Sequence, residues 1–226
     1  MNFFRGMWAI IQKDLTAEFR TKQLVSSMLI FAVLTLIVFV FSFDPSKAVV
    51  QQVFPGMIWV CIIFAGMLGL NRSFVSEKQN DCLTGMLLCP VSSNAIYYGK
   101  TIANLIYMFI IETVTIPLFA VLFNYQIPVG SILPLMLILA LGTIGFMAVG
   151  TFLAALSANA KSSEILLPVI LFPVLVPIVL GAVQATSVIL SGGQASDWFS
   201  WFKILAAYDV IFLAIPFLLF EYVLEV

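Results

Sequence analysis

Six strongly apolar segments, separated by short polar stretches, recur along the whole chain. Each has about the length of roughly 20 apolar residues that a transmembrane helix needs. This pattern predicts an all-α, polytopic membrane protein that forms a single transmembrane domain over residues 1–226. The six predicted spans cover residues 24–43, 53–70, 101–123, 131–156, 165–189 and 203–224.

The segment before the first span has an amphipathic pattern. Its large apolar residues recur on one face of a helix, and several basic residues lie between them. We therefore expect an N-terminal helix that lies in the membrane interface with its basic side toward lipid headgroups. A plain charged leader is the alternative. The apolar face contains Phe4, Trp8, Ile11, Leu15 and Phe19, and the basic residues are Arg5, Lys13, Arg20 and Lys22.

The longest polar stretch, residues 71–100, separates the second and third spans. Its apolar residues recur at a spacing that predicts a short amphipathic helix, which Pro90 ends. The segment 91–94 then offers a turn and a new N-cap. Because a simple linker needs only solubility, an apolar helix here predicts a docking surface for another molecule. The apolar residues are Phe74, Leu83, Met86, Leu87 and Leu88.

Prolines and glycines inside two of the spans predict local geometry. Three prolines in the fifth span indicate a kinked or broken helix. Three glycines in the fourth span permit close contact with neighbouring helices. These residues are Pro168, Pro173 and Pro177, and Gly142, Gly145 and Gly150.

Lys and Arg residues concentrate on one side of the predicted spans. Eight of the ten lie in residues 1–23, 71–100 and 157–164, and two lie in the segments that face the other side. Cytoplasmic segments carry the excess of these residues. We therefore expect both termini and the docking helix in the cytoplasm.

Two carboxylates interrupt the apolar spans. Glu112 lies near the middle of the third span, and we expect Asp209 in the outer half of the sixth. A charged carboxylate at the bilayer centre costs roughly 2.5–3.5 kcal/mol on insertion scales, so each group needs a partner, a proton or water. For Glu112, two interpretations stay open: a hydrogen bond between helices, and a polar lining of a substrate path or subunit interface. For Asp209 we expect contact with a hydroxyl of a neighbouring span.

Aromatic residues cluster before the sixth span, in residues 191–202, which we interpret as an outer loop. Trp198 and Trp201, with Phe199 and Phe202 beside them, are typical of an aromatic belt that anchors a span at the membrane boundary. The alternative is a stacking surface for a flat apolar ligand.

Composition narrows the function. The chain is 62% hydrophobic and 9% charged, far below the roughly 25% charge of soluble domains. Its net charge of −1 gives no reason to expect nucleic acid as a partner. Histidine is absent, which removes the usual ligand of zinc and of haem iron. The sequence contains no phosphate-binding loop and no nucleophile beside a base, so we do not expect an enzyme.

Two motifs carry a family resemblance. The stretch from Phe74 and Glu77 through Met86-Leu87-Leu88-Cys89-Pro90 to Gly99-Lys100 resembles the cytoplasmic loop of type-2 ABC exporter permeases. The segment Phe54-Pro55-Gly56-Met57-Ile58-Trp59 at the start of the second span is more specific and resembles the CcmB family, the haem exporter B proteins of cytochrome c maturation. One departure concerns Asp81-Cys82, where the family usually has a Gly after its acidic residue, so the local turn differs.

The resemblance implies a non-catalytic permease subunit in the bacterial inner membrane. Its expected partners are a CcmA-like cytoplasmic ATPase that binds the ATP, membrane proteins of the CcmC and CcmE kind, and a second permease copy. Haem is the implied cargo, either exported itself or carried by a haem-loaded chaperone that the complex releases with ATP, and the chain itself binds no cofactor. A permease for drugs, lipids or polysaccharides and a stand-alone secondary transporter or channel remain alternatives. The residues implied in ATPase coupling are Phe74, Glu77, Lys78, Leu83, Met86, Leu87 and Pro90.

Overall fold

A computed structural model describes residues 3–43, 47–79, 82, 85, 89–158 and 163–224, and these residues form an all-helical bundle. Six helices of the described residues are long and apolar enough to cross a membrane, which confirms the predicted fold class. The elements are α1 (Phe3–Thr21), α2 (Gln23–Ser42), α3 (Lys47–Gln79), α5 (Ser93–Leu122), the short 3-10 helix η1 (Val129–Ser131), α6 (Ile132–Ala158), α7 (Ser163–Leu190) and α8 (Ala195–Leu224).

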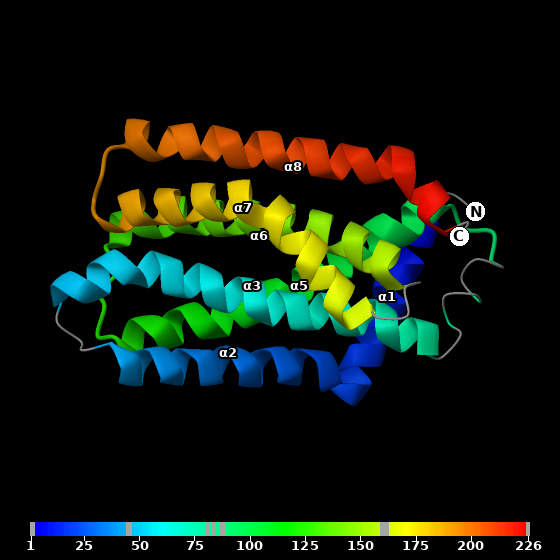
Figure 1. The fold of residues 1–226 in the computed structure, drawn as a ribbon, viewed down its shortest axis with the longest axis horizontal. Helices are drawn as coiled ribbons and strands as arrows, with labels where there is room; N and C mark the ends of the chain where they lie inside the picture. Colours follow the sequence, from blue (N-terminus) through cyan, green and yellow to red (C-terminus); the bar gives the residue numbers. More distant parts are fainter. Residues whose placement is uncertain are drawn as a thin grey trace.

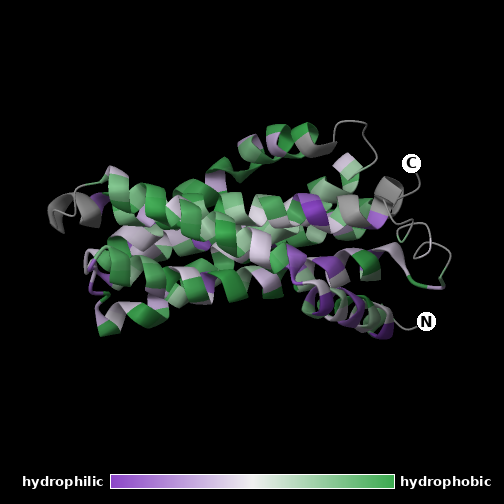
Figure 2. Ribbon diagram, turned by 90° about the horizontal axis from the view of Figure 1, so that it is seen from below, coloured by the Kyte–Doolittle hydropathy of each residue, from purple (hydrophilic) through white to green (hydrophobic). Residues whose placement is uncertain are grey.

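The six long helices run side by side along the longest axis, and α1 lies across one end of them (Figure 1). At this end α1 begins, α3 ends, α5 begins and α8 ends. We call it the α1 end. Hydrophobic residues cover the length of the bundle, whereas hydrophilic residues gather on α1 and the helix ends beside it (Figure 2).

The helix of the second span extends further than the sequence predicted. α3 continues through Gln79, so Phe74 and Glu77 belong to its last turns and not to a separate helix. α5 begins at Ser93, and the hydroxyl of Ser92 accepts a hydrogen bond from the backbone N–H of Ala95 at 3.4 Å. This bond confirms the predicted N-cap. The apolar residues Leu83, Met86 and Leu87 lie outside the described residues, as does the side chain of Lys78.

The prediction of a kinked or broken fifth span is met by a kink, whereas the prediction of an outer loop before the sixth span was only partly right. α7 stays helical across its three prolines and bends in its middle, so it is kinked but not broken (Figures 1 and 2). α8 begins at Ala195, so most of the residues expected in an outer loop form its first turns. The turn before α8 uses Gly192 at a φ of 75°, a left-handed conformation that suits glycine.

Glycines on α6 receive side chains from the helices around it. A Cβ at Gly142 would lie 2.1 Å from the Trp59 ring, and one at Gly150 would lie 2.2 Å from Leu70, both from α3. A Cβ at Gly145 would overlap side chains of α7 and α8. These contacts confirm the close approach that the glycines predicted, because any larger residue would push the neighbouring helices apart.

The Pro-Gly-x-Ile-Trp motif lies at the centre of this packing. Trp59 is 2% exposed, and its indole N–H donates a hydrogen bond to the Thr186 hydroxyl of α7 at 3.0 Å. The ring also fills the space above Gly142 on α6. Trp59 therefore joins three spans at one point, which explains the structural value of a tryptophan at this position.

Candidate functional site

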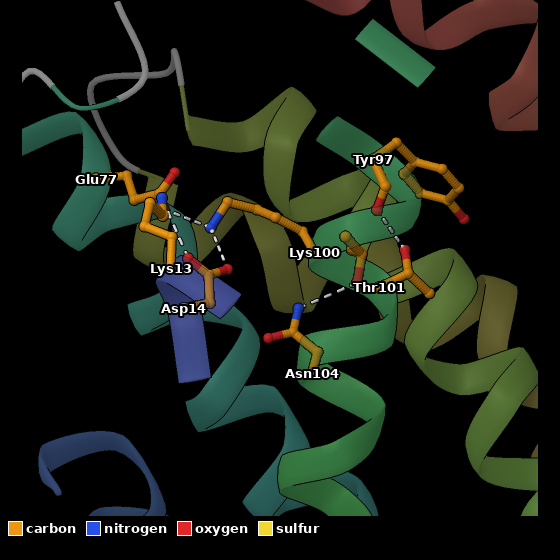
Figure 3. A network of polar contacts seen from close by, with 8 residues as sticks. Lys13, Asp14, Glu77, Tyr97, Lys100, Thr101 and Asn104 are labelled. Atoms are coloured by element: carbon orange, nitrogen blue, oxygen red, sulfur yellow. Dashed lines mark hydrogen bonds and ion pairs between the residues drawn. The ribbon is translucent and has the colours of Figure 1, made fainter. Parts of the chain in front are cut away.

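Four charged side chains from three helices meet at the α1 end (Figure 3). Lys13 and Asp14 come from α1, Glu77 from the end of α3, and Lys100 from the second turn of α5. The Lys100 amine lies 3.1 Å from an Asp14 oxygen and 2.6 Å from a Glu77 oxygen. The Lys13 amine lies 3.1 Å from Asp14 and also contacts Glu77. We call these four residues the charge cluster.

The charge cluster has two cations and two anions in a largely buried place. The Lys100 side chain is only 1% exposed, and its amine lies 5.2 Å from the centre of the buried Phe74 ring. Burial lowers the pKa of the Lys13 amine, but the carboxylates of Asp14 and Glu77 outweigh that effect and raise its pKa above the usual value. The amine therefore stays charged. Such a balanced arrangement holds the ends of α3 and α5 together through α1.

Sequence reasoning did not find the charge cluster. It placed Lys13 toward lipid headgroups and Glu77 among the residues implied in ATPase coupling. In the structure, Lys13 and Glu77 contact each other although 64 residues separate them, and 86 residues separate Lys100 from Asp14. The only signal in the sequence was the presence of opposite charges in two segments that the orientation rule places on the same side.

α1 is fixed to the bundle at two further points. A Cβ at Gly99 would lie 3.0 Å from Ile10 and 3.1 Å from the Met7 carbonyl oxygen, so α1 packs closely on α5 there. The carboxylate of Glu18 accepts hydrogen bonds from the first backbone N–H groups of α2, including that of Val25 at 2.8 Å. This side chain therefore caps α2 across the corner between the two helices.

The apolar face predicted for α1 divides in the structure. Ile11 turns inward beside Ile10, whereas Phe4, Trp8 and Phe19 are exposed. The exposed rings remain available to the membrane interface, as an interfacial helix requires. The polar side does not face only headgroups, because Lys13 and Asp14 take part in the charge cluster.

A row of polar pairs joins α5 to α6 inside the bundle. The Asn104 amide donates to the Thr151 hydroxyl at 3.2 Å, and the Thr143 hydroxyl donates to the Glu112 carboxylate. The two pairs are eight residues apart on each antiparallel helix. Glu112 is 5% exposed, so it faces protein, and its observed contact is a hydrogen bond between helices.

The Glu112–Thr143 contact leads to a test. Glu112→Gln is expected to leave stability nearly unchanged, because the amide oxygen still accepts from Thr143. Glu112→Leu leaves this buried hydroxyl without its partner, and bonds of this kind between membrane helices contribute about 0.6 kcal/mol and up to about 1.7. Thermal unfolding of the purified protein measures the difference. Thr113→Val is the matched control, because Thr113 is exposed and its hydroxyl donates to the Phe109 carbonyl of its own helix. Equal melting temperatures of the Gln and Leu variants would contradict a stabilising hydrogen bond between Glu112 and Thr143.

Asp209 does not lie where the sequence suggested. It is the middle residue of α8 rather than a residue of its outer half, and it is 5% exposed. No hydroxyl reaches it: neither carboxylate oxygen has a hydrogen-bond partner among the described residues. The nearby Tyr208 hydroxyl donates instead to the Val174 carbonyl of α7 at 2.9 Å.

Trp198 and Trp201 lie in the first turns of α8, at the end of the bundle opposite α1. Both are partly buried against the core. The Trp198 ring meets the Phe202 ring edge to face, and the Lys203 amine lies 4.9 Å from the centre of the Phe199 ring. Pro90 is exposed in the bend before α5. Within the described ranges, no group of three or more acidic, Cys or His residues has the arrangement of a metal site.

Comparison with known proteins covers nearly the whole chain. The sequence model of the CcmB protein family matches residues 5–224. Heme exporter protein B of Pseudomonas aeruginosa is 25% identical over 201 residues, which cover 88% of each chain. Heme exporter protein B of Rhodobacter capsulatus is 28% identical over 177 residues, 78% of this chain and 80% of the relative. This match over the full set of spans, together with the buried Trp59 motif, shows that the chain belongs to the CcmB family.

Proposed function

We propose that the chain is the membrane permease subunit of an ABC complex in cytochrome c maturation, and that a separate CcmA-like ATPase drives it. The observation that carries the proposal is the family match over residues 5–224, with relatives named heme exporter protein B. The chain supplies the spans and the partner supplies ATP hydrolysis. The other partners are membrane proteins of the CcmC and CcmE kind and a second copy of the permease.

The ATPase would bind the α1 end, which would lie in the cytoplasm with the protein in the bacterial inner membrane. Two features support this orientation. Both α1 and the last residues of α8 lie at this end, and so do the described parts of the segments 1–23, 71–100 and 157–164, which hold eight of the ten Lys and Arg residues of the sequence. Basic residues are enriched on the cytoplasmic side of membrane proteins.

Haem is the cargo, either as the free molecule or on a haem-loaded chaperone that the complex releases. This chain has no histidine, so any axial nitrogen from histidine must come from another subunit. Its own contribution to a haem path would be apolar. A permease of another type-2 ABC exporter is the second candidate, because the motif between α3 and α5 is shared with such proteins.

The coupling segment would consist of two parts with different roles. Phe74 and Glu77 are buried in the last turns of α3 and would act as a fixed base within the chain. Leu83, Met86 and Leu87 would enter an apolar cleft of the ATPase. Lys78 would face the rim of that cleft and Pro90 would end the segment. Firm attachment of the base lets closure of the ATPase move the spans.

The test is copurification of the ATPase with substituted permeases at matched membrane levels. Leu83→Asp and Leu87→Asp are each expected to abolish it, because truncating an apolar anchor at an interface typically costs about 2 kcal/mol and a buried charge costs more. Lys78→Ala is expected to weaken it slightly. Ser92→Asp is the matched control, since it adds the same charge nearby while aspartate still caps α5. Unchanged copurification of both leucine variants would contradict the coupling role.

A further inference from the structure

Asp209 is enclosed by three helices. Its carboxylate lies against Gly145 of α6, where a Cβ would be 2.3 Å from the carboxylate oxygen. Ile178 of α7 closes the same space, with its terminal methyl 2.2 Å from that point. The Tyr208 ring lies 3.1 Å from it. The carboxylate is therefore held in a small apolar space that only a glycine on α6 leaves open.

No cation of the described residues neutralises this carboxylate. α6 carries no charged residue, and the single acidic residue of α7 lies in its first turn. On α5, Lys100 belongs to the charge cluster, and Glu112 bonds to Thr143. On α8, the Lys203 amine lies over the Phe199 ring. The other side-chain atoms that fill the space beside Gly145 are carbon atoms of Ile178 and of the Tyr208 ring, and the Tyr208 hydroxyl is bonded to a backbone carbonyl.

A bare charge in this position is unfavourable. Insertion scales assign roughly 2.5–3.5 kcal/mol to a charged aspartate at the centre of a span, and a partner is the usual remedy. A divalent cation such as Ca²⁺ or Mg²⁺ would need about six oxygen ligands. The neighbouring Tyr208 hydroxyl is already bonded to a backbone carbonyl, and neither Asp209 oxygen has a hydrogen-bond partner among the described residues. A proton needs only the carboxylate itself.

We propose that Asp209 is a proton-binding site in the middle of the membrane, occupied when α8 packs on α6. The side chain is then a neutral carboxylic acid, and its burial needs no counter-ion. If α8 separates from α6, water reaches the group. The O–H bond then breaks, the proton passes to water and the carboxylate keeps the electron pair. Contact between α8 and α6 and proton binding are therefore linked.

Glu112 marks the depth of this site. It bonds to Thr143, two residues from Gly145 on α6, a separation of about 3 Å along the helix axis. The two intramembrane carboxyl groups thus flank α6 at nearly one level. They differ in their contacts, since Glu112 has a hydroxyl partner and Asp209 has none among the described residues. Of these two groups, Asp209 is therefore the one whose burial depends on a bound proton alone.

Infrared spectroscopy of the purified protein in lipid tests the proposal. The carbonyl stretch of a protonated carboxyl is separate from the carboxylate and amide bands. At mildly acidic pH, where an exposed aspartate is already ionised, the wild-type spectrum minus that of Asp209→Asn is expected to show one protonated-carboxyl band. Asp197→Asn is the control on the same helix. Asp197 is exposed and accepts a hydrogen bond from Ser196, so its difference spectrum should show carboxylate bands.

Carboxylate bands in the Asp209 difference spectrum would overturn the proposal. A second measurement needs no variant and covers failure of Asp209→Asn to fold. Wild-type protein with isotopically labelled aspartate has five labelled side chains, and Asp209 is the one within the six predicted spans. A shifted protonated-carboxyl band at mildly acidic pH supports the site. Absence of this band refutes the proton-binding site, whatever cargo the complex carries.

Discussion

Lys100→Met is expected to destabilise the protein by about 3–5 kcal/mol, because removing one partner of a buried ion pair leaves uncompensated charge. Methionine keeps most of the side-chain length and removes only the amine. Asp14 and Glu77 would then share Lys13, whose side chain is 41% exposed. Glu77 already has one carboxylate oxygen without a hydrogen bond among the described residues. Thermal unfolding in detergent and the level of protein in membranes measure the loss.

Lys13→Met is the matched control within the same charge cluster. It removes the same group from a side chain that is partly hydrated, so we expect a much smaller loss of stability. Glu77→Gln combined with Lys100→Met should cost less than the sum of the two single changes, because the pair is then removed together. Equal effects of the two lysine variants would show that burial of Lys100 has no energetic consequence.

The second large effect is expected at the family motif. Trp59→Ala should destabilise the protein by about 3–5 kcal/mol, since it creates a cavity where three helices meet. The space beside Trp59 already contains a cavity of about 10 Å³ lined by Trp59, Ile63, Gly142, Phe146, Leu175, Ile178 and Val179. The lost ring would enlarge it. The buried Thr186 hydroxyl would also lose the indole N–H that it accepts from.

Three further variants separate packing from hydrogen bonding at Trp59. Trp59→Phe removes the N–H and keeps much of the ring, so its cost should be about 0.6 kcal/mol from the bond plus a smaller packing loss. Gly142→Ala should destabilise, because the added Cβ would lie 2.1 Å from the Trp59 ring. Gly56→Ala in the same motif meets no atom within 4 Å and should be tolerated. A melting temperature of Gly142→Ala equal to that of the wild type would contradict the close packing.

The two sets of contacts occupy different parts of the bundle. The charge cluster fixes the α1 end, where the ATPase is proposed to bind, whereas Trp59 fixes the interior of the spans. Changes in the charge cluster should therefore affect both stability and coupling. Changes at Trp59 should act first on packing of the spans. The melting temperature and the amount of copurified ATPase should therefore both be measured for Lys100→Met and Trp59→Ala. Together they distinguish an effect on coupling from an effect on packing of the spans.

Much of the fold follows from local sequence. Runs of about 20 apolar residues predict spans, because a helix that satisfies its own backbone hydrogen bonds is the form that such runs adopt in lipid. The N-cap at Ser92 and the glycines of α6 were also predictable, since each acts within a helical turn or through its small size. The extension of α3 to Gln79 was not, because its last turns are held by the ion pairs of Glu77 with Lys13 of α1 and Lys100 of α5.

The sequence by itself therefore determined the all-α membrane fold, the number of spans, the clustering of basic residues and the family. Only the tertiary structure decided which polar groups meet. Lys100 pairs with residues of α1 and α3 far away in the chain, Glu112 bonds to Thr143, and Asp209 has no bonded partner among the described residues. The physical reason is that hydropathy and helical period fix the position of a residue on its own helix. The partner of a buried charge depends on how separate helices are rotated and packed against each other.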